Sequence, residues 1–436
     1  MLRKMAIKIE LIGVFCIVSL ILGGCSAKKE PTAISVALFQ APASQALIQF
    51  LSEFEKETGV KVKYEILPYA DLKAKVEQQF FAKSGDYDVI MADCIWIPSF
   101  ATRGFLGKLD TTAYESKDYD FADVLPALDD YLGRYPKNGI RYGMPFMSNT
   151  HMMAYRKSIV GPVAQSFGIP LPGDSPETAW SWDTYLKVAE AITHRGLKTN
   201  PPLYGTSLQA RSSAWIVYEW YSELFGFVQD QNARITGLPT FDTSAVEAMN
   251  YYANLYKVAP KEALTWGHEE ETSAICSGKC AMDATSNVEL AANLLDSSCG
   301  AKGDIEFAYP PVGRSGIASP DMGGYGLLLS AFSKSPGNAS AFILWAASKD
   351  VHRRIVLNGG SPIRLSEIKD EVVLAKYPYL GFYDKLIHDS VYRARVPKWP
   401  ELEDMISREL TAVMKGEKDA STAAQNVRNW INSNSM

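Results

Sequence analysis

Hydrophobic positions change their spacing repeatedly along the first hundred residues. Residues 34–39 form an unbroken apolar run, which is typical of a buried strand, and residues 47–54 place apolar side chains at helical spacing. Residues 60–66 alternate between apolar and polar side chains, as a half-buried strand does. Residues 72–80 return to helical spacing and residues 89–92 form another apolar run. This strand–helix order predicts an α/β fold with a parallel sheet covered by helices on both faces.

Helical spacing recurs in the rest of the chain. Residues 184–194 follow a polar start at Ser181, and three further stretches carry apolar residues at steps of three and four: 246–256, 339–346 and 423–431. Residues 196–210 contain two adjacent prolines, so we predict a loop there.

The N-terminus has the composition of an export signal. Residues 1–10 carry three basic side chains and one acid, and residues 11–22 carry no charge, which is too short for a comfortable bilayer span. The following Leu-Gly-Gly-Cys, ending at Cys25, resembles the lipobox of bacterial lipoproteins. The resemblance implies that residues 1–24 are removed, that Cys25 is acylated, and that residues 25–32 are a tether. The alternative is an uncleaved membrane anchor.

Composition and charge exclude several classes of protein. The chain has 436 residues, 47% of them hydrophobic, which is typical of a globular protein and exceeds what one hydrophobic core holds. A net charge of −5 gives no general field for nucleic acid or anionic lipid.

Four cysteines remain after Cys16 and Cys25 in a setting outside the cytoplasm that permits disulfides. We predict a bond between Cys280 and Cys299, with Cys276–Cys280 as the alternative pairing, and a buried free thiol at Cys94. We predict no metal site, because no second Cys or His pair follows Cys276-x-x-x-Cys280 at ligand spacing. The acidic run that begins at His268 is interpreted as a solvated face.

Catalytic signatures are scarce. The chain has no G-x-S-x-G elbow, no P-loop, no dinucleotide fingerprint after a strand and no H-E-x-x-H, and it has only five histidines. The sequence therefore favours a binding protein that uses no cofactor over an enzyme. Two carboxylates facing each other across a cleft, as in a glycosidase, would be invisible in such a search.

Six segments resemble the family 1 extracellular solute-binding proteins, in the order in which that family has them. They include an Asp-Val strand followed by a helix, a Trp-containing helix start, a Gly-Lys-x-Ala-Met return strand and a Gly-Gly-Ser-Pro loop. The segments are residues 87–110, 142–158, 181–192, 277–285, 322–342 and 359–364.

The resemblance implies a periplasmic-binding-protein architecture, with two α/β lobes, a hinge of several crossings and a central ligand cleft. We expect crossings near Pro145, Ser286 and Leu328. The lobes would then comprise residues 33–145 with 287–328, and residues 146–286 with 329–436.

The implied function is the capture component of an ABC importer for a sugar, oligosaccharide or polyol. Its partners would be this ligand and the transmembrane permease subunits, with the membrane reached through the lipid anchor only. We expect a monomer that is exported and faces the periplasm or the cell exterior, with no nucleic-acid partner.

Candidate ligand-binding residues follow from strand ends, paired glycines and aromatic side chains. Side chains at the carboxyl ends of strands reach the cleft of an open α/β sheet, and ring faces stack on the C–H faces of sugars. Asp93 is equally well interpreted as a helix cap, and the tryptophans as core. The candidates are Gln40, Asp93, Trp96, Asn149, Trp215, Trp266, Asp283, Tyr325 and Arg364.

Three other functions stay open. A binding protein for a sugar phosphate or another small anion would need cationic groups in the cleft, for which Arg364 and Arg211 are the candidates. A glycan-acting lipoprotein enzyme and a sensor that presents its ligand to a receptor are the others.

Overall fold

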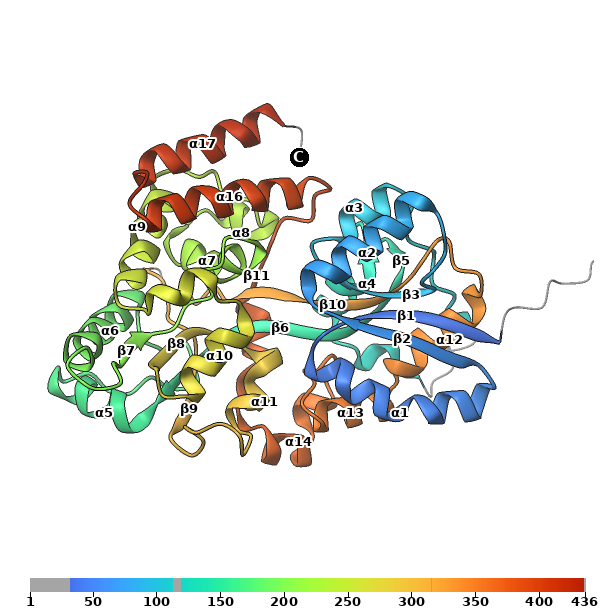
Figure 1. Ribbon diagram of the computed structural model, residues 1–436, viewed down its shortest axis with the longest axis horizontal. Helices are drawn as coiled ribbons and strands as arrows, with labels where there is room; N and C mark the ends of the chain where they lie inside the picture. Colours follow the sequence, from blue (N-terminus) through green and yellow to red (C-terminus); the bar gives the residue numbers. More distant parts are fainter. Residues whose placement is uncertain (1–31, 113–118, 315, 435–436) are drawn as a thin grey trace, which may run out of the picture.

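The computed structural model describes residues 32–434, apart from 113–118 and 315. The export signal and Cys25 lie outside the described residues. None of the helices in the described part of the chain has the length and apolar composition that a bilayer span requires. Figure 1 shows two lobes joined by two long strands, β6 (Gly143–Arg156) and β10 (Asp321–Leu329). The short strand β11 (Val391–Tyr392) pairs with β10 beside them.

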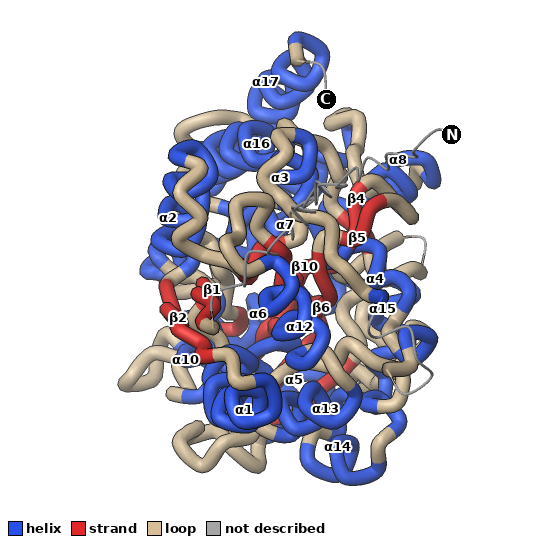
Figure 2. The backbone as a smooth tube through the Cα atoms, turned by 90° about the vertical axis from the view of Figure 1, so that its right-hand side faces the viewer, coloured by secondary structure: helices blue, strands red, loops and turns tan. Residues whose placement is uncertain are grey.

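The first lobe, at the right of Figure 1, begins with the predicted strand–helix alternation. Its strands β1 and β2 are parallel, as are β1 and β3, and helices lie on both faces of this sheet (Figure 2). The elements are β1 (Ala33–Phe39), α1 (Pro42–Thr58), β2 (Lys61–Leu67), α2 (Tyr69–Ala82), β3 (Val89–Asp93), α3 (Ile97–Thr102), α4 (Pro126–Gly133), β4 (Arg134–Tyr135), β5 (Ile140–Arg141), α12 (Pro336–Ala346) and α13 (Lys349–Leu357).

The second lobe contains three of the six helices that were predicted from spacing: α6, α9 and α17. Ser181 caps α6 by accepting a hydrogen bond from the Thr184 N–H. Strand β7 lies inside the segment that we predicted to be a loop. The elements are α5 (Lys157–Ser166), α6 (Trp182–Gly196), β7 (Tyr204–Thr206), α7 (Ala214–Phe227), α8 (Gln231–Thr236), α9 (Thr243–Lys257), α10 (His268–Cys276), β8 (Cys280–Asn287), β9 (Ile305–Ala308), α16 (Trp399–Met414) and α17 (Ala420–Ser433).

One mixed sheet runs through both lobes, in the order β2-β1-β3-β10-β6-β8-β7. Strand β10 lies between β3 and β6 and is antiparallel to both, whereas β7 and β8 at the other end of the sheet are parallel again. Strand β6 is buried along almost its whole length and pairs with β10 near its start and with β8 near its end. Short helices cover the hinge below these strands: α11 (Ala291–Leu294), α14 (Glu371–Lys376) and α15 (Tyr383–Asp389).

The chain divides between the lobes differently from the boundaries we expected. Strand β9 pairs with the end of β6, beside the second-lobe strand β8, although we assigned residues 287–328 to the first lobe. Helices α12 and α13 pack against α1, although we assigned residues 329–436 to the second lobe. The expected crossing at Ser286 is absent, because β8 pairs with the second-lobe strand β7 and the next strand, β9, lies again beside the end of β6. Long-range strand pairing decides these positions, and local sequence patterns do not report it.

The disulfide joins Cys276 to Cys299, so the predicted Cys280–Cys299 pairing and its alternative are both wrong. Cys276 ends α10 and is half-buried, whereas Cys280 lies fully buried in β8 as a free thiol. A strand residue whose side chain faces the core cannot reach the turn that holds Cys299. Cys94 is a buried free thiol, as predicted.

Candidate functional site

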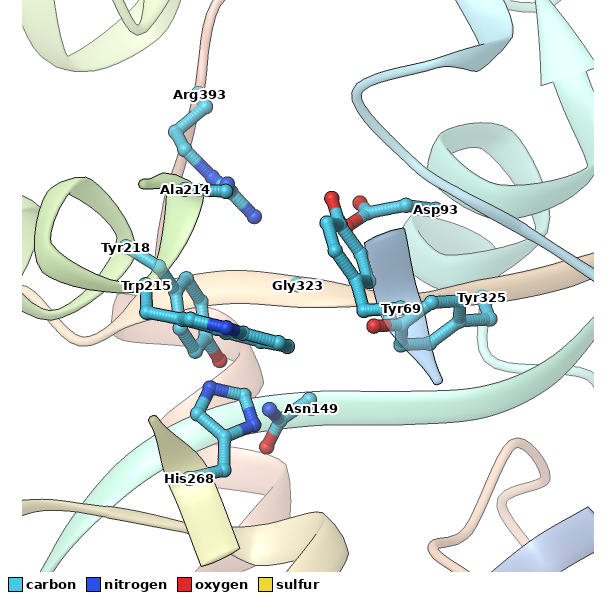
Figure 3. A pocket seen from close by; sticks show the side chains of 11 residues that line it. Tyr69, Asp93, Asn149, Ala214, Trp215, Tyr218, His268, Gly323, Tyr325 and Arg393 are labelled. Carbon is cyan, nitrogen blue, oxygen red and sulfur yellow. The ribbon is translucent and has the colours of Figure 1, made fainter. Parts of the chain in front are cut away.

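A narrow cavity lies between the lobes, where β6 and β10 pass from one to the other (Figure 3). The cavity itself is small, with a volume of about 20 Å³. Residues from both lobes and from the connecting strands line it: Tyr69, Asp93, Asn149, Ala214, Trp215, Tyr218, His268, Gly323, Gly324, Tyr325 and Arg393.

The first lobe contributes an aromatic and acidic wall. Tyr69 begins α2, directly after β2, and its hydroxyl donates a hydrogen bond of 2.8 Å to the Asp93 carboxylate. Asp93 ends β3 and pairs in register with Tyr325 on β10. The Tyr325 ring stacks on Phe39 at 4.9 Å, which fixes its plane at the edge of the cavity. Asp93 and Tyr325 therefore lie where the sequence analysis expected them.

The second lobe contributes the opposite wall. Trp215 and Tyr218 lie one turn apart on α7, and His268 begins α10. The Trp215 ring lies 4.8 Å from the ring of Tyr69, which belongs to the first lobe. This direct ring contact between the lobes means that the structure is in a closed conformation.

Arg393 is the cation of the cavity, and carboxylates already neutralise it. Its Nε lies 2.9 Å from Asp321 and its Nη1 lies 3.2 Å from Glu403. Its guanidinium lies over the ring of Tyr218 at 4.8 Å. Burial alone would lower the pKa of Arg393, but the facing Asp321 carboxylate holds it well above its ordinary value. Arg393 therefore stays charged, but the neighbouring carboxylates already offset that charge, so it attracts an anionic ligand only weakly.

Neutral hydrogen-bonding groups complete the site. Burial raises the pKa values of Tyr218 and Tyr325 well above the ordinary value, so both hydroxyls stay protonated. Asn149 donates to Asn287 at 2.9 Å, and His268 Nδ1 lies 2.7 Å from Glu289. The Tyr218 hydroxyl and His268 Nε2 are buried and have no partner in the described structure. Such groups are costly to leave unpaired, so they indicate a polar ligand.

The absence of side chains at Gly323 and Gly324 allows other parts of the protein to approach closely. A Cβ on Gly323 would lie 3.1 Å from the Tyr218 ring, and a Cβ on Gly324 would lie 2.5 Å from the Met147 carbonyl oxygen. Gly324 also has φ +128°, which side chains rarely adopt. We expected the glycines to admit a ligand close to the backbone, but they admit Tyr218 and strand β6.

Residues 33–352 match the sequence profile of the bacterial extracellular solute-binding proteins. The chain belongs to this family.

Relatives and solved structures agree with this assignment. A probable ABC transporter-binding protein of Deinococcus radiodurans is 26% identical over 372 residues, which are 82% of this chain and 83% of the relative. An ABC transporter solute-binding protein of Agrobacterium radiobacter K84 in complex with ribitol superimposes with a TM-score of 0.80 at 22% identity, covering 93% of this chain and 99% of that one. A maltose-bound protein of T. maritima gives 0.79 at 20% identity, covering 92% and 99%. The two structures show that the solute-binding protein has their two-lobe fold.

Asn149 and Trp215 also line the cavity of this solute-binding protein, but two other aromatic candidates do not. Trp96 is 1% exposed and lies behind Tyr69, with ring centroids 5.1 Å apart. Trp266 is buried under the Lys279 ammonium, at the surface of the second lobe. Trp96 and Trp266 therefore have the packing role that the sequence analysis left open as the alternative to ligand binding.

The remaining polar candidates also lie away from the cavity. Gln40 is exposed in a wide groove between α1 and α10. Arg364 is fully buried in the first lobe, where it donates to the Ala347 carbonyl and lies 3.5 Å from Asp123. Arg211 pairs with Glu270.

Asp283 belongs to a buried acidic cluster inside the second lobe, together with Glu219, Glu223 and Glu271. Glu219 accepts hydrogen bonds from the Tyr252 and Thr285 hydroxyls and the Gln209 N–H. Burial raises the pKa of Glu219 to about 8 and that of Asp283 to about 7. The cluster sits one turn beyond the cavity residues of α7 and α10, and it supports these helices from within.

The sequence analysis missed Ala214 and four cavity residues with polar or aromatic side chains. Tyr69 directly follows the carboxyl end of β2, so the rule that identified Asp93 could have found it as well. Tyr218 lies on a helix rich in aromatic residues, where spacing does not separate cavity residues from core residues, and His268 was placed wrongly on a solvated face. Arg393 carries no local signal, because its position depends on the pairing of β11 with β10.

Proposed function

We propose that this solute-binding protein captures a small neutral polyhydroxy compound, a polyol or a sugar, and delivers it to the transmembrane subunits of an ABC importer. The observation that carries the proposal is the set of buried, unpaired hydrogen-bonding atoms beside aromatic faces, above all the Tyr218 hydroxyl and His268 Nε2. A hydroxyl group can donate and accept at once, and the C–H face of a polyol or sugar packs on a ring.

The electrostatics argue against a sugar phosphate or another small anion. Arg393 is shared between Asp321 and Glu403, and Asp93 adds a further carboxylate to the cavity wall. Arg364 and Arg211, which the anion hypothesis needs, are engaged elsewhere. An anion would enter a buried space that already has more carboxylates than cations, which is costly.

The narrowness of the cavity favours a small ligand. Its two walls already touch where the rings of Tyr69 and Trp215 lie 4.8 Å apart, which leaves little room for an oligosaccharide. The ribitol complex of the Agrobacterium protein, which has the same fold, is consistent with a small ligand.

The contact of Tyr69 with Trp215 supports capture by lobe closure. A ligand shifts a conformational equilibrium only when it binds one state better than the other, and the cavity has walls from both lobes only when they are closed. The closed lobes would then present the surface that a permease recognises.

We further propose that the protein acts as a monomer without catalysis and is held at the membrane by acylation of Cys25. One acyl chain binds a membrane only weakly, so several chains at one residue would be needed for a stable anchor. The Cys25→Ser variant should appear in the soluble fraction. Variant protein that stays in carbonate-washed membranes would contradict the anchor.

A thermal-shift screen against neutral polyols, neutral sugars and small organic anions tests the ligand class. A ligand at 100 times its dissociation constant stabilises the folded state by about 2.7 kcal/mol, which is easily detected. The Trp215→Ala variant is the control, because it removes the Trp215 ring from the cavity wall that the second lobe contributes. Stabilisation by anions but by no neutral polyol or sugar would refute the proposal. Release of products from an oligosaccharide would contradict the absence of catalysis.

A further inference from the structure

The environment of His268 fixes which of its ring nitrogens carries a proton. Nδ1 lies 2.7 Å from the Glu289 carboxylate, and the Glu289 N–H in turn donates to the Asn149 side chain at 3.4 Å. The side chains of His268 and Glu289 are only 6% and 2% exposed. Because a carboxylate can only accept, Nδ1 must be the donor in this pair.

The other nitrogen of His268, Nε2, is buried without a partner and borders the cavity (Figure 3). The ring packs against Trp215 and Tyr218, with centroid distances of 4.1 Å and 5.6 Å. In a neutral imidazole whose Nδ1 is protonated, Nε2 carries a lone pair and can only accept.

We propose that His268 is a specificity-determining residue that accepts a hydrogen bond from a ligand hydroxyl through Nε2, with Glu289 as the positioning residue that selects this tautomer. The inference rests on the proposed function and deepens it, because it states which chemical group the ligand must present at this wall. The neighbouring Tyr218 hydroxyl can donate to the ligand or accept from it.

This arrangement requires the ligand to present a hydrogen-bond donor to His268 Nε2. If the ligand carries a methyl group at this point, Nε2 stays unpaired. If it carries an ether or an anionic oxygen, a lone pair of that oxygen faces the lone pair of Nε2 and the two repel each other. An unpaired buried acceptor costs enough to weaken binding by about tenfold or more. The same wall thus admits a polyol hydroxyl and disfavours its O-methylated or phosphorylated derivative.

The first test needs no ligand. Nitrogen-15 NMR of the imidazoles in the full mature chain distinguishes a protonated ring nitrogen from one with a lone pair, and the His268→Gln variant assigns the resonances among the five histidines. We expect a protonated Nδ1 and an unprotonated Nε2 at pH 7. A protonated Nε2, with or without a protonated Nδ1, overturns the proposal.

Variants of Glu289 test the positioning role. Glu289→Gln keeps an oxygen that can accept from Nδ1 and should keep the tautomer. Glu289→Met has similar length without an acceptor and should let the proton exchange between the two nitrogens. An unchanged tautomer in Glu289→Met contradicts the role of Glu289.

Titration calorimetry with ribitol tests the contact itself. We expect His268→Phe to weaken ribitol binding by about tenfold or more, and His268→Gln, which retains an acceptor, to weaken it less. Equal affinity of wild type and His268→Phe would overturn the contact. If ribitol does not bind while the tautomer is as stated, the choice of ribitol as ligand is contradicted and the assignment of the acceptor stands.

Discussion

Removing the disulfide between Cys276 and Cys299 should destabilise the second lobe by an amount that the loop length sets. The two cysteines are 23 residues apart in the sequence. In the chain-entropy description, closing such a loop restricts the unfolded chain by about 11 to 12 cal/mol/K, or about 3.4 kcal/mol at 25 °C. For a unit of 150–250 residues, this corresponds to a lower melting temperature by about 7 to 14 °C.

Cys276→Ser is the suitable variant, because Cys276 is only half-buried and the substitution costs little beyond the lost bond. Calorimetry of wild type and variant, each with and without dithiothreitol, measures the effect. Reductant should lower the melting temperature of the wild type to that of the variant and leave the variant unchanged. A change of less than about 2 °C in the wild type, with the bond verified by peptide mapping, would refute the entropic reasoning.

Three further outcomes are expected. Burial raises the pKa of Glu219 from 4.5 to about 8 and that of Asp283 to about 7, so the folded state holds protons that the unfolded chain releases. The free energy of unfolding should therefore fall as pH rises from about 5 to 8. Glu219→Gln should flatten this slope in pH-dependent denaturant titrations, and an equal slope would contradict the buried-acid explanation. Gly324→Ala should cost about 1 to 3 kcal/mol in urea unfolding, because φ +128° and the Met147 carbonyl both oppose a Cβ; a neutral effect would show that the strand adjusts freely. Tyr69→Ala should open the lobes and increase the radius of gyration in X-ray scattering, because it removes the ring contact with Trp215; an unchanged radius would mean that other contacts hold the closed form.

The parts of the fold that depend on local spacing could be predicted from the sequence. Strands β1 and β3 and helices α1, α6, α9, α12 and α17 lie where apolar periodicity places them. The antiparallel insertion of β10 between β3 and β6 could not be predicted, because pairing partners are more than 170 residues apart along the chain. The short β7 was hidden by its proline-rich surroundings.

The candidate site was predictable in part. A strand end marks Asp93 and a glycine pair marks Tyr325, whereas Asn149 was proposed for its place near an expected lobe crossing and Trp215 for its aromatic ring. All four line the cavity. Arg364 shows the limit of the approach. Its guanidinium is suited to ligand binding, but it satisfies backbone carbonyls in the core, and only the three-dimensional structure distinguishes the two uses.

The central position of β10 in the sheet also has a consequence for biosynthesis. Strand β3 ends at Asp93, but its neighbour in the sheet begins at Asp321, so more than 220 residues must be made before the first lobe can complete its sheet. At about 5 to 20 residues per second, translation of this interval takes on the order of 10 to 50 s. Throughout that time β3 has an open edge, as does β6 once it has been made, and open edges are prone to pair with other chains. The nascent protein therefore depends on being kept unfolded until β10 has emerged, and fragments that end before residue 321 should not yield a folded first lobe.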